Sequence, residues 1–234
     1  MKLTLKTPAK INLGLHIHRK RRDGYHELET LLQMVSLYDE LELESLASGI
    51  ELECGTPGIP TDDTNLAYRA AHLLQKTCKA GGRGVRIRLK KKIPSGAGLG
   101  GGSGNAAGVL LGLNRLWDLK MSRSHLVSLA AELGSDVPFF LTAPCALGTG
   151  RGERLEPLTP SSKFQVLLVF PGFPVATSWA YQNLKLKLTK RENNISILRK
   201  SLSQSDVARL GSQLYNDLEL LVIQRFPEIQ VIKD

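Results

Sequence analysis

The sequence predicts an α+β fold, and two observations support this prediction. Apolar and polar residues alternate, as they do in half-buried strands, in several segments before residue 94. Helical spacing of apolar residues dominates after residue 102. Strands grouped early and helices grouped late favour an α+β arrangement over regularly alternating strands and helices.

The expected strands have one polar face. The alternation is present at residues 3–18, 37–46, 49–54 and 85–94. This pattern is typical of antiparallel strands with one side in water. Pro8 interrupts the first strand because proline donates no ladder hydrogen bond. The stretch FQVLLVF, residues 164–170, is apolar except for Gln165 and therefore predicts a central strand.

The expected helices carry their apolar residues on one face. They cover residues 65–78, 103–117, 122–134, 178–188, 205–224 and 227–234. Ser103 and Ser122 are the expected N-caps of the second and third helices. The last pattern starts at Pro227, an acceptable first position, and is still helical at the final residue. We therefore expect the C-terminus to be truncated.

The composition indicates a globular protein with an anionic partner. The 234 residues suffice for one large or two small domains, and 42% of them are hydrophobic. The formal net charge of +9 favours nucleic acid, a membrane surface or phosphorylated metabolites as partners. The basic excess is concentrated at residues 19–22 and 83–92, without interleaved aromatic residues. A solvated basic face explains these charges equally well.

No segment indicates a membrane or secreted protein. No run approaches the roughly 18 apolar residues that span a bilayer, and the N-terminus lacks the apolar core of a signal peptide. The three cysteines are odd in number and form no C-x-x-C pair, so neither a disulfide framework nor a zinc site is indicated. We therefore expect a cytoplasmic protein.

Glycine is concentrated between an expected strand and an expected helix. Six of the ten residues from Gly96 to Asn105 are glycine. Glycine loses more backbone entropy on folding than any other residue, so such a cluster needs a physical reason. Bare backbone that leads into a helix N-terminus, with its four unbonded N–H groups, is suited to binding a polyphosphate.

Two common phosphate-binding motifs fit this stretch poorly. A P-loop requires Gly-Lys-Ser/Thr at its end, and no lysine follows these glycines. Gly96, Gly98 and Gly101 satisfy the dinucleotide pattern G-x-G-x-x-G. However, the preceding strand VRIRLKKK is charged, and the following helix leads into another helix rather than into a strand that ends in an acidic residue.

A third motif fits closely. The pattern P-x-x-x-G-L-G-G-G-S-x-N-A-A, residues 94–107, resembles the second motif of the GHMP small-molecule kinases. Further agreement in order and spacing comes from residues 8–28, 133–141 and 148–158 and from NDLE at residues 216–219. Together these segments resemble the branch of the superfamily whose acceptor is a cytidine diphosphate-linked methylerythritol. The chain differs from the family in having Gly104 where a second serine is usual.

The resemblance implies a two-domain GHMP kinase fold. The expected N-terminal, ribosomal protein S5 domain 2-like domain covers residues 1–150 and binds ATP, and a C-terminal α+β domain covers residues 151–234. The family's third glycine-rich motif would lie beyond the last residue. The implied reaction is transfer of the ATP γ-phosphoryl group to the 2-hydroxyl of the methylerythritol moiety, in non-mevalonate isoprenoid synthesis.

The resemblance also implies catalytic and ATP-binding residues. Asp136 is the expected general base, and Lys10 is expected beside it, where a cation keeps the carboxylate ionised. Alternatively, Asp136 caps the turn that follows it and Lys10 is an exposed strand lysine. Mg²⁺ is expected with ATP, bound mainly through phosphate oxygens. The expected ATP-binding residues are Lys91, Pro94, Ser95, Gly96, Ala97, Gly98, Leu99, Gly100, Gly101, Gly102, Ser103 and Gly104.

The expected acceptor site is aromatic. Tyr25 would stack on the cytosine and His26 would bind the edge of the base. Tyr181 would supply a second stacking ring, Thr177 a ribose or phosphate contact, and Asn12 a further polar contact. Two aromatic faces at roughly 1–3 kcal/mol each could supply most of the affinity for a nucleotide-linked alcohol.

Two alternatives remain open. A related kinase of mevalonate, homoserine or a sugar would share the glycine motif but not the pocket at residues 23–26. A degenerate ATP- or RNA-binding protein without turnover would agree with the charge of +9. Salt-dependent RNA binding would identify the second alternative. For the kinase, we expect a small-molecule partner only, neither nucleic acid nor membrane, and a monomer or weak homodimer.

Overall fold

The computed structural model describes residues 1–78, 82–161, 163–184 and 194–234, and these form two compact units. Unit 1 consists of Met1–Lys10, Met34–Ser95 and Leu99–Thr142, and unit 2 of Ile11–Gln33, Gly96–Gly98 and Ala143–Asp234. The units interleave in sequence because two long strands, β1 (Lys2–Lys20) and β2 (His26–Leu46), contribute to both. The single boundary after residue 150 stays a prediction of domain organisation.

The described strands share one sheet with the order β3-β4-β2-β1-β7, where β7 is Tyr215–Asn216. Strand β5 (Cys145–Gly150) pairs with β2, and β6 (Arg154–Pro157) pairs with β5. Strand β4 (Gly84–Lys90) is antiparallel to β2, as expected, but parallel to β3 (Ile50–Cys54). The prediction that these strands are all antiparallel is therefore wrong for the β3 and β4 pair. The reason is that helix α1 (Leu66–Thr77) carries the chain back along the sheet, so β3, α1 and β4 form a crossover connection.

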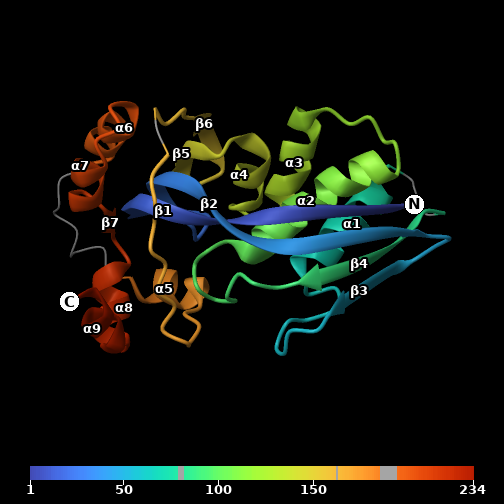
Figure 1. The fold of residues 1–234 in the computed structure, drawn as a ribbon, viewed down its shortest axis with the longest axis horizontal. Coiled ribbons are helices and arrows are strands. Elements are labelled where there is room, and N and C mark those ends of the chain that lie inside the picture. The colour runs from blue at the N-terminus through green and yellow to red at the C-terminus, as the bar shows by residue number, and fades with distance from the viewer. Residues whose placement is uncertain (79–81, 162, 185–193) are drawn as a thin grey trace. The chain divides into compact units, whose positions relative to one another are not determined.

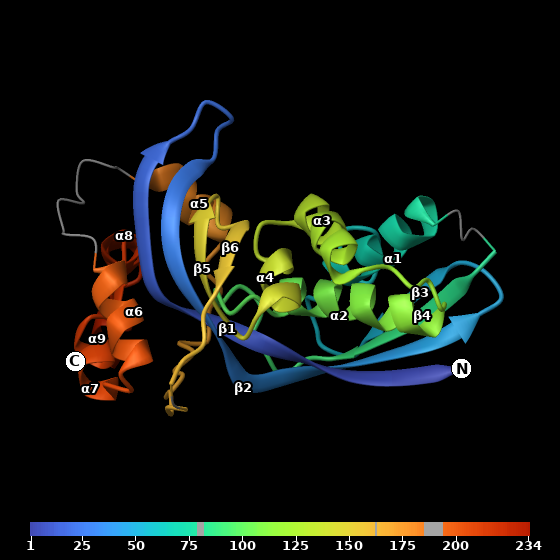
Figure 2. The ribbon, with the colours of Figure 1, turned by 90° about the horizontal axis from the view of Figure 1, so that it is seen from above.

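The helices of unit 1 cover one face of its strands (Figure 2). They are α1, α2 (Gly101–Leu116), α3 (Arg123–Leu133) and the short α4 (Val137–Thr142). Helix α2 approaches the sheet closely because glycines face it. A Cβ atom on Gly108 would lie 2.5 Å from Thr7 Cγ2 and 2.9 Å from Leu41 Cδ2. Alternate β2 residues, Leu41 and Leu43, are fully buried beneath this helix.

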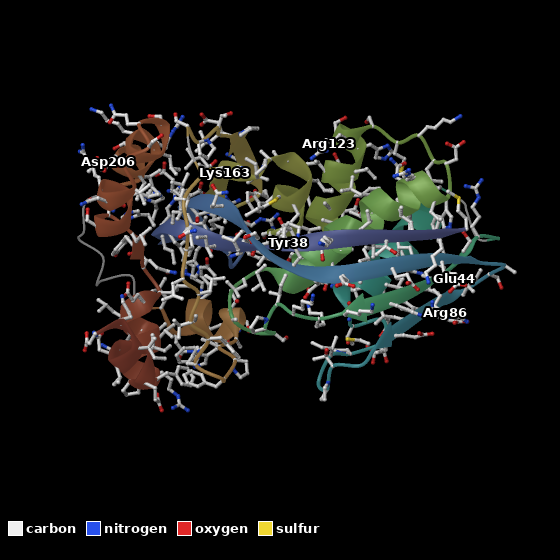
Figure 3. All side chains as sticks on the ribbon, viewed as in Figure 1. Tyr38, Glu44, Arg86, Arg123, Lys163 and Asp206 are labelled. Atoms are coloured by element: carbon white, nitrogen blue, oxygen red, sulfur yellow. The ribbon has the colours of Figure 1, made fainter. Side chains whose placement is uncertain are left out.

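The opposite face of these strands carries ion pairs. Arg86 and Glu44 are register partners on β4 and β2, and their side chains meet at 3.6 Å (Figure 3). Arg88 Nη1 lies 2.7 Å from Glu42 and 2.8 Å from Glu44. Hydrogen bonds from Arg88 to Glu42 and then to Glu53 raise the pKa of this guanidinium above its ordinary value. Arg86 and Arg88 of the basic segment at residues 83–92 are therefore balanced by glutamates on the neighbouring strands.

Unit 2 combines parts of β1 and β2 with the remaining short elements (Figure 1). Its core contains Leu13, Leu31, Cys145, Ile195 and Leu198. A Cβ atom on Gly14 of β1 would lie 2.6 Å from Leu198 Cδ1, so β1 and helix α6 (Ile195–Ser203) pack without space between them. The elements are β5 (Cys145–Gly150), β6 (Arg154–Pro157), β7 (Tyr215–Asn216), α5 (Thr177–Asn183), α6 (Ile195–Ser203), α7 (Val207–Ser212), α8 (Glu219–Arg225) and α9 (Glu228–Lys233).

Helix boundaries confirm one expected cap and correct another. Ser122 caps α3, and its Oγ accepts a hydrogen bond from the His125 amide at 3.2 Å. Ser103 does not cap α2, because the helix already begins at Gly101 and its cap is Gly100, with φ +68°. Glycine allows this left-handed cap, which a serine would adopt only at a cost.

Two further expectations of secondary structure are corrected. The helix expected at residues 205–224 is interrupted by β7, after which the Asn216 side chain accepts from the Leu218 amide at 3.0 Å. Of the helix expected at residues 178–188, α5 covers the first part, and residues 185–188 lie outside the described residues.

The apolar stretch at residues 164–170 is not a central strand. It is paired with no described strand, and its side chains are largely exposed, with Leu167 88% exposed and Val169 58% exposed. Hydrophobicity alone predicted a buried strand, but a strand is buried only when neighbours cover both of its faces.

Among the described helices, none is long and apolar enough to span a bilayer.

Candidate active site

The glycine stretch joins β4 to α2, and its glycines have separate structural reasons. Gly100 has φ +68°, and a Cβ atom there would lie 2.9 Å from Lys10 Cγ and 3.0 Å from Phe140 Cζ. A Cβ atom on Gly104 would lie 2.9 Å from the Pro8 carbonyl oxygen. Close approach of protein atoms therefore excludes side chains at these two positions.

Gly98 differs from these two. It also has a positive φ, +71°, but a Cβ atom there would meet nothing within 4 Å. Helix α2 begins three residues later, and the first amides of a helix lack partners inside the helix and carry a partial positive charge. The first backbone hydrogen bond recorded for α2 runs from the Gly104 amide to the Gly100 carbonyl, at 2.8 Å. Bare backbone and a helix N-terminus at this position can bind an anion.

Lys10 and Asp136, expected as neighbours, lie together in unit 1. The Lys10 Nζ atom is 3.4 Å from Asp136 Oδ2. The Lys10 side chain is only 8% exposed, whereas that of Asp136 is 44% exposed. The backbone amide of Lys10 donates to the Leu99 carbonyl at 2.9 Å, so β1 is tied directly to the glycine stretch. The alternative of an exposed strand lysine at position 10 is therefore wrong.

The position of Asp136 suits a group that meets a ligand. It precedes α4, whose residues Phe139 and Phe140 are buried and pack edge to face, with ring centroids 5.4 Å apart. The apolar helix fixes the backbone at Asp136, while its half-exposed carboxylate remains accessible. A buried ammonium beside an accessible carboxylate can neutralise developing negative charge and accept a proton.

Lys91 lies behind the glycine stretch rather than on its surface. Its side chain is 7% exposed and its ammonium contacts the carboxylate of Asp39. It also donates to Asn105 Oδ1 at 3.0 Å. A Cβ atom on Gly101 would lie 3.0 Å from Lys91 Nζ, so the ammonium lies directly against the first turn of α2. A direct contact of Lys91 with nucleotide stays a prediction, and the observed contacts support the loop from within.

The expected acceptor residues all belong to unit 2, and two of them are in contact. The rings of His26 and Tyr181 stack, with centroids 5.4 Å apart and planes inclined by 28°. Burial, and then the charge of Lys20, lower the pKa of His26 below its ordinary value, which favours the neutral imidazole. Tyr25 is 53% exposed, and the Arg151 guanidinium lies over its ring, 4.7 Å from the centroid.

The two remaining acceptor residues have different environments. Asn12 Nδ2 donates to Thr30 Oγ1 at 2.7 Å, and Thr30 in turn donates to the Gly14 carbonyl at 2.8 Å. This chain of hydrogen bonds fixes the Asn12 amide. Thr177 is exposed at the first residue of α5, the helix that also carries Tyr181. The contacts of all five expected acceptor residues with a substrate stay predictions.

Sequence reasoning missed Asp39 and Arg151. Asp39 alternates in phase with Leu41 and Leu43, so it occupies an inward position of the strand. A charged residue in the apolar phase of a strand pattern was the signal that could have identified it. Arg151 had no such signal, because only the three-dimensional structure brings it over Tyr25.

Comparison with known proteins supports the fold and identifies relatives. A model of the GHMP kinases N terminal domain matches residues 65–143. The chain is 43% identical over 246 residues to the 4-diphosphocytidyl-2-C-methyl-D-erythritol kinase of Acaryochloris marina. This alignment covers 99% of this chain and 79% of the relative. Identity to the enzyme of the same name from Syntrophus aciditrophicus is 45% over 234 residues, covering 99% and 81%.

A solved structure agrees with these relatives. The crystal structure of a 4-(cytidine 5'-diphospho)-2C-methyl-D-erythritol kinase superposes with a TM-score of 0.78 at 39% identity, covering 98% of this chain and 81% of that chain. The expected GHMP kinase fold is thereby confirmed. Since the identity extends over nearly all of its residues, the chain belongs to the 4-diphosphocytidyl-2-C-methyl-D-erythritol kinase family.

Proposed function

We propose that this chain transfers the γ-phosphoryl group of ATP to the 2-hydroxyl of 4-diphosphocytidyl-2-C-methyl-D-erythritol. The observation that carries the proposal is the contact of 3.4 Å between Lys10 Nζ and Asp136 Oδ2. Lys10 lies on β1, and its backbone amide is hydrogen-bonded to Leu99 of the glycine stretch. Membership of the family and the names of the relatives support the choice of acceptor.

The reaction needs charge neutralisation and one proton acceptor. The backbone from Pro94 to Gly104 and the N-terminus of α2 bind the phosphates. Asp136 takes the proton of the acceptor hydroxyl, and the oxygen then attacks the γ-phosphorus. The bond from the γ-phosphorus to the bridging oxygen breaks, ADP departs, and Asp136 later releases its proton to water. Lys10 stabilises the negative charge that develops on the attacking oxygen.

Mg²⁺ fits this site mainly through the nucleotide. Among the described residues, no three or more His, Cys, Asp or Glu side chains are grouped so that they could hold a metal ion. A divalent ion would be held mainly by phosphate oxygens, with the Ser103 hydroxyl in the first turn of α2 as its protein contact, and would need no such group. When bound, the ion neutralises charge on the transferred phosphoryl group.

The acceptor is bound, in this proposal, by the unit 2 residues. Tyr25 stacks on the cytosine, and neutral His26 exchanges hydrogen bonds with the edge of the base. Its stacked neighbour Tyr181 holds the His26 ring in place. Thr177 and Asn12 make the remaining polar contacts. The enzyme acts in the cytoplasm, where ATP is available.

The test is a coupled assay of ADP release with the cytidine acceptor, mevalonate and homoserine. Of the three acceptors, we expect only the cytidine acceptor to support ADP release. Asp136→Asn removes the proton acceptor and should lower kcat by about 10²- to 10⁴-fold while ATP still binds. Asp63→Asn, which changes an exposed carboxylate elsewhere in unit 1, is the matched control and should retain full turnover. Wild-type turnover in Asp136→Asn would remove this residue from the mechanism, and preference for another acceptor would overturn the substrate assignment.

A further inference from the structure

Asp39 is a fully buried carboxylate that the proposed mechanism does not use. It lies on β2 with 0% of its surface exposed. Its Oδ1 atom accepts from the amides of Lys92 at 2.7 Å and Ile93 at 2.9 Å. Its Oδ2 atom accepts from Asn105 Nδ2 at 3.0 Å and contacts the Lys91 ammonium. Both oxygens therefore have two donors each.

These donors lie at the two ends of the glycine stretch. Residues 91–93 lead out of β4 and enter the stretch at Pro94, while Asn105 lies on the first turns of α2, where the stretch ends. One carboxylate on a neighbouring strand thus holds the entry and the exit of the same loop. Asn105 is 2% exposed, and its Nδ2 also donates to Thr7 Oγ1 at 2.8 Å, which joins the network to β1.

The charges of this network are enclosed. The side chains of Asp39 and Lys91 are 0% and 7% exposed. A buried charge is costly unless it is paired and hydrogen-bonded, and removal of one partner leaves the other uncompensated. An isolated hydrophobic contact between β2 and α2 would stabilise the fold at lower cost. The arrangement is therefore better suited to fixing geometry than to adding stability.

We propose that Asp39 is a positioning residue for the ATP site, an inference that rests on the proposed function. By holding Lys92, Ile93 and Asn105 at fixed distances, it sets the separation between the two ends of the glycine stretch. That separation determines where the backbone amides and the N-terminus of α2 can meet the phosphates. Lys91 and Asn105 act with it, and none of the three needs to contact the nucleotide.

The first variant removes the charge and keeps the shape. In Asp39→Asn the new amide N–H₂ faces two other donors, Lys91 and Asn105, so the bond to Asn105 is lost. We expect the dissociation constant for a non-hydrolysable ATP analogue, and the KM for ATP, to rise at least tenfold. The KM for the cytidine acceptor at saturating ATP should stay within twofold of the wild-type value.

The second variant restores the network with its charge moved. In the double variant Asp39→Asn, Asn105→Asp, the new amide donates to the new carboxylate, which also accepts from Lys91 and from the Thr7 hydroxyl. The hydrogen bonds then again join β1, β2, α2 and residues 91–93. We expect this exchange to recover most of the ATP affinity, a rescue that a simple loss of packing would not show.

A matched control separates positioning from general stability. Asp217 is also a buried carboxylate, 7% exposed, and accepts from the Ile17 amide at 2.5 Å, but it belongs to unit 2. Asp217→Asn should lower the melting temperature. The ratio of the KM for ATP to the KM for the acceptor should not rise above its wild-type value. An equal rise of both KM values in folded Asp39→Asn, or unchanged binding of the ATP analogue, would overturn the proposal.

A further measurement tests the role of Asp39 if the Asp39→Asn variant does not fold. If Asp39→Asn shows no folding transition, hydrogen exchange of the Lys92 and Ile93 amides in the wild-type chain replaces it. Positioning predicts further protection of these amides by the ATP analogue, because coupling between two sites is reciprocal, and unchanged exchange contradicts it. Wild-type binding of the analogue without turnover of the cytidine acceptor contradicts only the proposed function, whereas no binding contradicts both.

Discussion

Gly98→Ala tests whether bare backbone in the glycine stretch serves a ligand. Gly98 has φ +71° and open space where a Cβ atom would stand. Gly49, in the turn between β2 and β3, has φ +77° and equally open space. The same substitution at these two positions therefore causes a similar backbone strain and no contact with other protein atoms.

The expected effects on stability are similar and those on ATP binding differ. A left-handed alanine costs roughly 1–2 kcal/mol, which lowers the melting temperature of a chain of this size by roughly 2–8 °C for either variant. A methyl group forced into an occupied phosphate site costs a further amount of about 1–3 kcal/mol, as overpacking does elsewhere. At 1.4 kcal/mol per factor of ten, Gly98→Ala should raise the KM for ATP roughly fivefold to hundredfold.

The assay is steady-state ADP release at varied ATP, together with thermal denaturation of both variants. Gly49→Ala should keep the wild-type KM for ATP at its own reduced melting temperature. If Gly98→Ala and Gly49→Ala have the same KM for ATP, the space at Gly98 is not where the phosphates bind, and the reasoning fails.

Three further predictions concern unit 2. Tyr25→Ala should raise the KM for the cytidine acceptor roughly fivefold to hundredfold with an unchanged KM for ATP, whereas Tyr25→Phe keeps the ring and should stay near wild type; an equal loss for both substrates would indicate misfolding. Because burial lowers the pKa of His26, the unfolded chain binds a proton at this imidazole at a higher pH than the folded chain does, so folding stability should fall as the pH drops below 6.5. Urea denaturation should show a smaller fall for His26→Gln, and an identical fall would refute the lowered pKa of His26. Leu167→Ser should change the free energy of unfolding by less than about 0.5 kcal/mol and Leu198→Ala by about 2–5 kcal/mol, since these side chains are 88% and 0% exposed; similar costs for both would contradict the exposure of residues 164–170.

The strands and helices of unit 1 were largely predictable, because their patterns are local. Alternation identified β3 and β4, and the serine and spacing at residues 122–134 identified α3 and its cap. The first half of β2 was missed, since HELETLLQMV mixes apolar runs with polar residues and shows no clear period. The direction of β3 relative to β4 could not be read from either strand, because it depends on the path of the chain through α1.

Burial in unit 2 was harder to predict because it depends on partners distant in sequence. The apolar run at residues 164–170 has the composition of a buried strand but is exposed, with Phe170 40% and Leu168 38% exposed. Conversely, the short strand β5, CALGTG, has a weak strand signal and is mostly buried beside β2. Composition describes what a segment can tolerate, whereas burial depends on which segments cover it.

The candidate site was predicted in part. The resemblance brought Lys10 and Asp136 together, and the structure has them in contact. It also assigned Lys91 to the nucleotide, although this ammonium is buried against Asp39 and Asn105. A lysine in a basic run before a phosphate loop suggests a direct contact with nucleotide, which stays a prediction, and the buried acid that Lys91 contacts lies 52 residues earlier in the chain.

The most direct measurement is a crystal structure of this chain with a non-hydrolysable ATP analogue and the cytidine acceptor. The account predicts the triphosphate against the backbone of residues 94–104 and the N-terminus of α2, with the acceptor 2-hydroxyl within hydrogen-bonding distance of Asp136. A triphosphate bound elsewhere, with these amides facing solvent or protein, would contradict it.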